Sequence, residues 1–77
     1  MKESHDIALR GLVAVTKMGL TEDYTNRFLG IREAFGKALF LLERNDREGL
    51  KYLDVAIEST VKRFGVELTV KMLGLKY

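Results

Sequence analysis

Apolar residues recur along the chain with the spacing of α-helices, and this pattern predicts three of them. From Glu22 to Arg44 the apolar side chains return at alternating steps of four and three, the period of a helix with one buried stripe. A second stripe with this kind of spacing lies from Asp46 to Phe64, and an apolar segment runs from Ser4 to Met18. The stripes comprise Tyr24, Phe28, Ile31, Phe35, Ala38 and Leu42, then Leu50, Leu53, Ile57, Val61 and Phe64.

Glycines and capping residues predict where these helices begin and end. Thr21 precedes two acidic residues, as an N-cap does. Asn45 stands three residues before Glu48, which predicts a capping box with Asn45 as the cap. Three of the glycines stand at apparent helix ends before an apolar residue, a pattern typical of glycine in the left-handed conformation after a last helical turn. They are Gly19, Gly65 and Gly74.

The last segment, residues 66–77, fits two kinds of structure. Val66, Leu68, Val70 and Met72 alternate as the residues of a strand do. The same segment also places Val66, Val70 and Leu73 on one face of a helix. Because no other segment has the pattern of a partner strand, we favour a short helix.

These elements predict an all-α fold in a single domain that spans residues 1–77. Only a few residues separate the second helix from the third, so the two should pack as an antiparallel helical hairpin. The N-terminal helix and the short C-terminal segment complete the subunit. We expect subunits to assemble into an oligomeric helical bundle.

The oligomer is expected because more apolar surface remains than one hairpin hides. The helix over residues 4–18 is apolar on two sides, and a domain of 77 residues has too little chain to cover both. A monomer with scattered apolar residues on its surface is the alternative. The residues that we assign to the subunit interface are Leu9, Leu12, Val13, Leu29, Phe40, Tyr52 and Val55.

Small residues form a stripe along one side of the second predicted helix. Gly30, Ala34 and Ala38 make up this stripe, and Gly36 lies in the same helix. A glycine inside a helix costs about 1 kcal/mol relative to alanine, so another interaction should offset it. We favour close packing of a neighbouring helix as that interaction, with a ligand lying on the bare backbone as the alternative.

Composition narrows the classes of function. The chain has no Cys and one His, which excludes disulfides and argues against structural zinc. Its apolar runs are shorter than the roughly 20 residues of a bilayer span, and residues 1–6 lack a signal-peptide pattern. We therefore expect a cytoplasmic protein without a membrane partner. The usual nucleotide-binding, metalloprotease and hydrolase motifs are missing, so we expect a binding protein without cofactor or metal and not an enzyme.

The net charge of +2 permits an anionic ligand, and four residues are candidates for holding one. Arg27 and Arg32 flank the apolar stripe near Tyr24, and Arg47 opens the third helix. An arginine beside an aromatic ring can hold a phosphate and help to stack a base. The alternative is a core aromatic residue with solvated arginines. Duplex nucleic acid is not expected, because no basic recognition helix follows a tight turn.

The stretch from Arg27 to Ala34, followed by Arg47 and Glu48 and then by Leu50, Leu53, Ala56 and Ile57, resembles a known protein family. These are small phage helical-hairpin proteins that sequester the cyclic nucleotide signals of bacterial CBASS or Thoeris immunity. The resemblance covers residues 25–64. It implies a homo-oligomer that holds a cyclic oligonucleotide between subunits. The positions that match are Arg27, Arg32 and Arg47.

We expect Tyr24 to stack on a base of the ligand because it is an aromatic residue near Arg27 and Arg32. The family resemblance does not include this position. The competing hypothesis is a small helical regulator or inhibitor that binds a host protein through an apolar helix face.

A melting experiment separates these two hypotheses. A ligand that binds only the native state raises the melting temperature, so cyclic dinucleotides or trinucleotides should stabilise a sequestering protein. Arg32→Ala should leave the fold intact and abolish that shift. An unchanged melting temperature across the whole panel would favour the protein-binding alternative.

Overall fold

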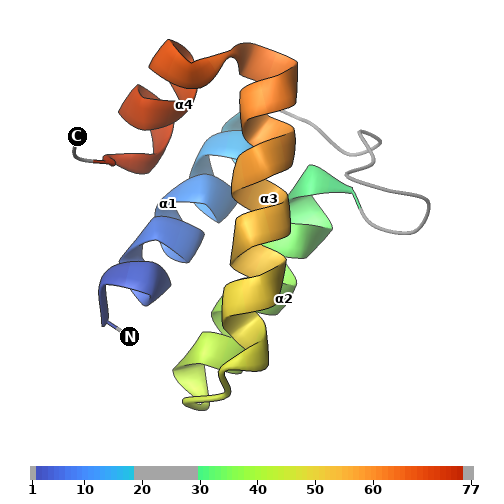
Figure 1. Cartoon of the computed structure of the whole chain (residues 1–77), viewed down its shortest axis with the longest axis vertical. Coiled ribbons are helices and arrows are strands. Elements are labelled where there is room, and N and C mark those ends of the chain that lie inside the picture. The colour runs from blue at the N-terminus through green and yellow to red at the C-terminus, as the bar shows by residue number, and fades with distance from the viewer. Residues whose placement is uncertain (1, 19–29, 76–77) are drawn as a thin grey trace.

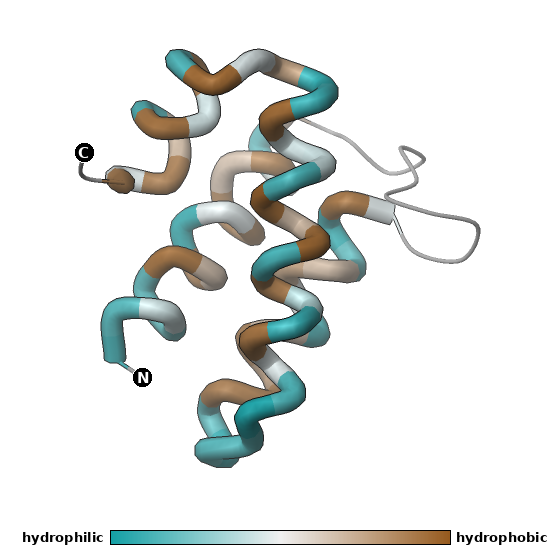
Figure 2. Tube along the Cα trace, in the orientation of Figure 1, coloured by the Kyte–Doolittle hydropathy of each residue, from teal (hydrophilic) through white to brown (hydrophobic). Residues whose placement is uncertain are grey.

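A computed structural model describes residues 2–18 and 30–75, and within these ranges the chain is helical. The helices are α1 (Lys2–Lys17), α2 (Ile31–Glu43), α3 (Glu48–Phe64) and α4 (Val66–Leu73) (Figure 1). This confirms the all-helical fold and the choice of helix over strand for the segment after residue 65. Each helix alternates between polar and apolar positions, as an amphipathic helix does (Figure 2).

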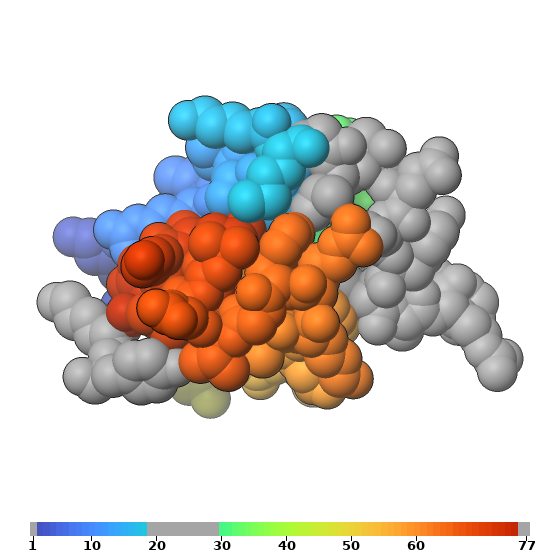
Figure 3. Space-filling model, turned by 90° about the horizontal axis from the view of Figure 1, so that it is seen from above, coloured from blue at the N-terminus to red at the C-terminus, as the bar shows by residue number. Residues whose placement is uncertain are grey.

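Helices α1 and α3 both pack against α2. Helices α2 and α3 lie side by side and are joined by a short turn, and α1 packs against α2. Helix α4 lies across one end of the molecule, where it contacts both α1 and α3 (Figure 3). Segments from the two ends of the chain, α1 and α4, therefore share one side of the molecule.

Helix α2 starts later than the apolar period predicts. Gly30 has an extended backbone (φ −77°, ψ 163°) and serves as the N-cap, so the helix begins at Ile31. The Ala34 amide donates a 3.0 Å hydrogen bond to the Gly30 carbonyl. The prediction of one helix from Glu22 to Arg44 is therefore wrong at Gly30. Glycine favours a helix end, and the spacing of apolar residues does not take this preference into account. Residues 19–29, including the expected cap Thr21, lie outside the described ranges.

Different residues cap the turn between α2 and α3 than the sequence predicts. Asn45 has a left-handed backbone (φ 58°), and the Asp46 amide donates a 3.0 Å hydrogen bond to the Leu41 carbonyl. This is the Schellman arrangement that ends a helix. The Glu48 amide then donates a 2.9 Å hydrogen bond to Asp46 Oδ1. The prediction of Asn45 as the cap of α3 is wrong, because Asn45 terminates α2 and the Asp46 carboxylate accepts the bond at the start of α3.

The contact between α1 and α2 depends on a glycine. Phe35 is a large, fully buried side chain, and its ring lies directly over the backbone of Gly11. A Cβ atom at Gly11 would fall within 3.0 Å of the ring. The other buried residues of α1, Ala8 and Val15, are also small, so α1 lies close to α2.

The α2–α3 contact is equally close. A Cβ atom at Gly49 would lie 2.7 Å from Leu42 Cγ and 2.9 Å from the Ala38 carbonyl oxygen. The apolar stripe predicted for α2 is confirmed over its described part, since its residues there are buried. Those residues are Ile31, Phe35, Ala38 and Leu42.

The stripe predicted for α3 is displaced around the helix. Its buried face consists of Gly49, Leu53, Ala56 and Thr60, and of these only Leu53 was predicted. Four predicted members are only partly buried, because the small residues occupy the line of closest contact. These four are Leu50, Ile57, Val61 and Phe64.

The expectation of close packing at the small residues of α2 holds at two of the four positions. Ala34 and Ala38 are fully buried. Gly30 precedes the helix, so no interior penalty arises there. The space around Gly36 is open, since a Cβ atom there would meet only Leu12 Cδ1, at 3.9 Å. The glycines that do permit close helix contact lie instead in α1 and α3.

Two glycines with positive φ set the direction of α4. Gly65 separates α3 from α4 with φ 89° and ψ 161°, an extended conformation and not the left-handed one that we predicted. Gly74 ends α4 in the predicted left-handed conformation, with φ 65° and ψ 32°. Both conformations strain a residue with a side chain. Gly19 lies outside the described residues.

Buried threonines complete the packing without unsatisfied polar groups. The Thr69 hydroxyl donates a 2.8 Å hydrogen bond to the Gly65 carbonyl, and the Thr60 hydroxyl donates a 2.6 Å bond to the Ala56 carbonyl. Each hydroxyl is thus paired within its own helix. Thr69 and Leu73 form the fully buried side of α4.

The same substitution should have opposite effects at two helical glycines. Alanine at Gly36 meets open space, so Gly36→Ala should stabilise the protein by about 0.5–1 kcal/mol. A methyl group at Gly11 would overlap the fully buried Phe35 ring. Gly11→Ala should therefore destabilise the protein by about 1–2 kcal/mol, even after the higher helix propensity of alanine is counted. Urea unfolding of both variants measures this difference. Equal stabilisation at both sites would contradict the packing described for Phe35.

Candidate protein-binding face

The described residues do not bring the predicted nucleotide-binding arginines together. Arg32 is exposed in the first turn of α2, and Arg47 is exposed in the turn before α3. At 1.5 Å of rise per residue along α2, the two lie roughly 20 Å apart. They cannot hold one phosphate within a single chain, so a shared site would need two subunits. Tyr24 and Arg27 lie outside the described residues, and the nucleotide site stays a prediction.

The predicted interface residues of α2 and α3 have partners within their own chain. Phe40 is 52% exposed, but the Arg44 guanidinium stacks 3.7 Å from its ring centroid. Arg44 Nη1 also donates a 3.1 Å hydrogen bond to the Phe40 carbonyl. Tyr52 is half-buried, with Lys37 Nζ 4.8 Å from its ring centroid. These cation–π contacts satisfy the ring faces. Val55 is half-buried.

The predicted interface residues of α1 divide into two groups. Leu12 is half-buried and packs against the core. Leu9 and Val13 are 43% and 44% exposed, and they stand one helical turn apart on the side opposite Gly11. Leu29 lies outside the described residues. Helix α1 therefore carries an apolar pair on its outer side.

That pair borders a cleft between α1 and α4 with a volume of 440 Å³. Leu68 is also exposed and lies one turn before Met72 on α4, so it extends the apolar surface of the cleft. We define the α1–α4 face as Leu9, Val13, Ala14, Leu68 and Met72. The residues that line the cleft are Leu9, Arg10, Val13, Ala14, Lys17 and Met72.

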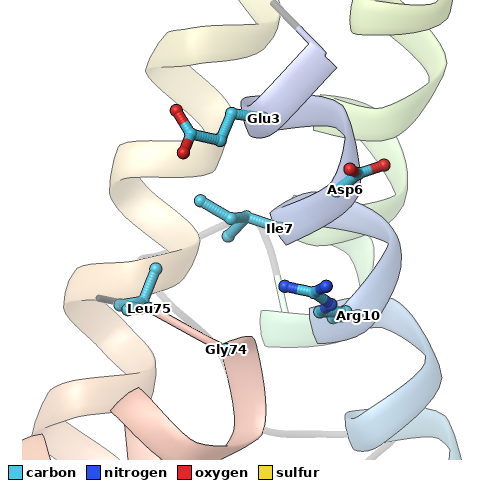
Figure 4. Close-up of a pocket in the computed structure, with 6 residues that line it drawn as sticks. All are labelled: Glu3, Asp6, Ile7, Arg10, Gly74 and Leu75. Carbon is cyan, nitrogen blue, oxygen red and sulfur yellow. The ribbon is translucent and has the colours of Figure 1, made fainter.

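Arg10 holds the two walls of this face together. Its Nη1 donates a 3.4 Å hydrogen bond to the Leu73 carbonyl at the end of α4, where a cation also complements the helix dipole. A Cβ atom at Gly74 would lie 2.5 Å from Arg10 Nη1, so the glycine makes room for the guanidinium. Ile7 and Leu75 lie on either side of the adjoining 330 Å³ cavity (Figure 4). Sequence reasoning missed this role, because 63 residues separate Arg10 from Leu73.

The remaining polar groups show no further site. His5 Nδ1 lies 3.8 Å from Asp6 Oδ1, an interaction between neighbours in the chain. Within residues 2–18 and 30–75, no three His, Cys, Asp or Glu side chains are placed to hold a metal ion. Each helix in these ranges is too short or too polar to cross a lipid bilayer.

Comparison with protein-family models, with curated proteins and with solved structures finds no significant match to this chain. The α1–α4 face is therefore the feature from which a function can be proposed.

Loss of the Arg10 hydrogen bond should loosen α4 and little else. Arg10→Met keeps an apolar stem and removes the donor, so amide hydrogen exchange in α4 should accelerate roughly three- to five-fold. Amides of α2 and α3 should keep their protection. Arg32→Met, which alters an exposed arginine on α2, is the matched control. Equal exchange of α4 in the two variants would show that Arg10 does not anchor it.

Proposed function

We propose that this chain is a non-enzymatic binding protein, and that the α1–α4 face is the surface that binds its partner. One observation carries the proposal: Leu9 and Val13 are exposed one turn apart and line a cleft with Met72. Single exposed apolar residues are ordinary, whereas adjoining ones with a polar rim mark interaction surfaces.

The shape of the face favours an amphipathic helix as the bound element. The cleft is lined by the Leu9 and Val13 pair of α1 and by Met72 of α4, and such a surface accepts apolar side chains spaced three and four residues apart on a bound helix. Lys17 stands at the rim of the cleft, so the bound helix should carry an acidic residue beside its apolar stripe. Phe40 is also exposed, but it does not line the cleft, and Arg44 stacks on one face of its ring.

A small anionic ligand fits this face poorly. Phosphate groups are bound by several converging donors, and Arg10 is the arginine of this cleft. Its guanidinium is already engaged with the Leu73 carbonyl. The non-enzymatic part of the proposal follows from the composition of the face, since aliphatic and thioether side chains bind by apolar contact and neither transfer protons nor attack bonds.

Site-specific photocrosslinking tests the proposed face. A photoreactive phenylalanine derivative at position 13 should form a discrete adduct in an extract of the source cells, whereas the same group at the exposed position 54 of α3 should not. Adding Leu9→Glu should abolish the position-13 adduct, because a buried unpaired carboxylate opposes docking.

Phe40→Glu is the control for that second change, since Phe40 is exposed on α2 away from the proposed face. It should leave the adduct intact. The proposed face would be refuted if position 13 formed no more adduct than position 54. It would also be refuted if Leu9→Glu and Phe40→Glu reduced the adduct equally.

A further inference from the structure

The outer side of α1 has the spacing of a helix-pairing seam. Asp6, Leu9, Val13 and Thr16 follow one another at steps of three, four and three. Leu9, Val13 and Thr16 are exposed, and the Asp6 side chain is 48% exposed. Asp6 is also among the residues that line the cavity beside Leu75 (Figure 4). This alternation is the one by which two helices pack along each other.

The charges on this seam are ordered so that α1 complements a reversed copy of itself. Asp6 lies before the apolar pair, and Lys17 lies after it at the other end of the helix. The midpoint between Asp6 and Lys17 falls half a residue from the midpoint between Leu9 and Val13, which is roughly 0.8 Å along the helix axis. One two-fold axis therefore serves both the apolar pair and the charged pair.

We propose that the α1–α4 face binds α1 of a second copy of this chain, in an antiparallel dimer with two-fold symmetry. This inference rests on the proposed function, whose partner it names. In the dimer, Leu9 lies opposite Val13 of the second copy, and Asp6 lies opposite Lys17 of the second copy. The contact is isologous, so each ion pair occurs twice. A parallel pairing would place Asp6 beside Asp6 and Lys17 beside Lys17, and this like-charge arrangement is unfavourable.

The cation of each intermolecular pair is Lys17, since the Arg10 guanidinium is engaged with Leu73. The contact is confined to one helix and the edge of another, which is less than the roughly 1,600 Å² buried in stable protein complexes. The dimer should therefore be reversible and depend on protein concentration.

Charge reversal combined with sedimentation equilibrium tests this dimer. The apparent mass of the wild-type chain should rise with concentration from 8.8 kDa toward twice that value. Asp6→Lys alone and Lys17→Asp alone should each weaken association about ten-fold or more, because each places two like-charge pairs in the dimer. An equimolar mixture of the two variants should associate again, since every facing pair then has opposite charges.

Matched controls separate the interface from general charge effects. Glu58→Lys on α3 reverses the charge of a residue in an exposed ion pair, 3.5 Å from Lys62, and should leave association unchanged. Circular dichroism of each variant checks that α1 remains helical, because both reversals also oppose the helix dipole. Recovery in the mixture should diminish at high salt, where exposed charges are screened.

Two results would overturn the proposal, and they are distinct from failure of the face itself. A wild-type chain that stays at 8.8 kDa over the whole concentration range has no self-association. If the chain associates, but the single charge reversals do not weaken association and the mixture does not restore it, the chain pairs through another surface. In both cases the position-13 crosslink still decides independently whether the α1–α4 face binds a different protein.

Discussion

The packing of the Phe35 ring on the backbone of Gly11 is the contact on which the arrangement of this protein depends. The ring is fully buried, and only a residue without a side chain leaves space for it. Helix α1 consequently turns its small residues, Ala8 and Val15, toward α2. Leu9 and Val13 then remain on the outer side. The exposed apolar pair that we propose as a binding surface is thus a geometric consequence of how the core is packed.

The second wall of that surface comes from the other end of the chain. Gly65 redirects the backbone after α3, and Gly74 ends α4 where the Arg10 guanidinium reaches the last turn. Because a positive φ strains other residues, the backbone at both ends of α4 favours glycine. Burial of Leu73 then places Met72 at the edge of the cleft. A binding face shared by α1 and α4 exists only when both of these conditions are met.

The charges of α1 serve two physical purposes at once. An acidic first turn and a basic last turn stabilise any isolated helix through its dipole. The placement of Asp6 before the apolar pair and of Lys17 after it makes the helix complementary to a reversed copy, and the dimer that we propose rests on this complementarity. Outside this face, Arg44 stacks on the ring of the exposed Phe40, and Lys37 lies over the ring of the half-buried Tyr52.

Local periodicity was sufficient to predict the helical class and the buried stripe of α2, because these depend on residues within a turn or two of each other. The helical tail was predicted because no other segment has the pattern of a partner strand. Tertiary packing decided which faces of α1 and α3 are buried. Gly11 and Gly49 lie at these contacts because they have no side chain, and a search for apolar residues does not single them out. Packing and backbone conformation also decided that Asn45 ends α2, that Gly30 precedes it, and that Arg10 anchors α4. The Arg10 contact joins residues 63 positions apart, which only folding brings together and which no spacing along the chain encodes.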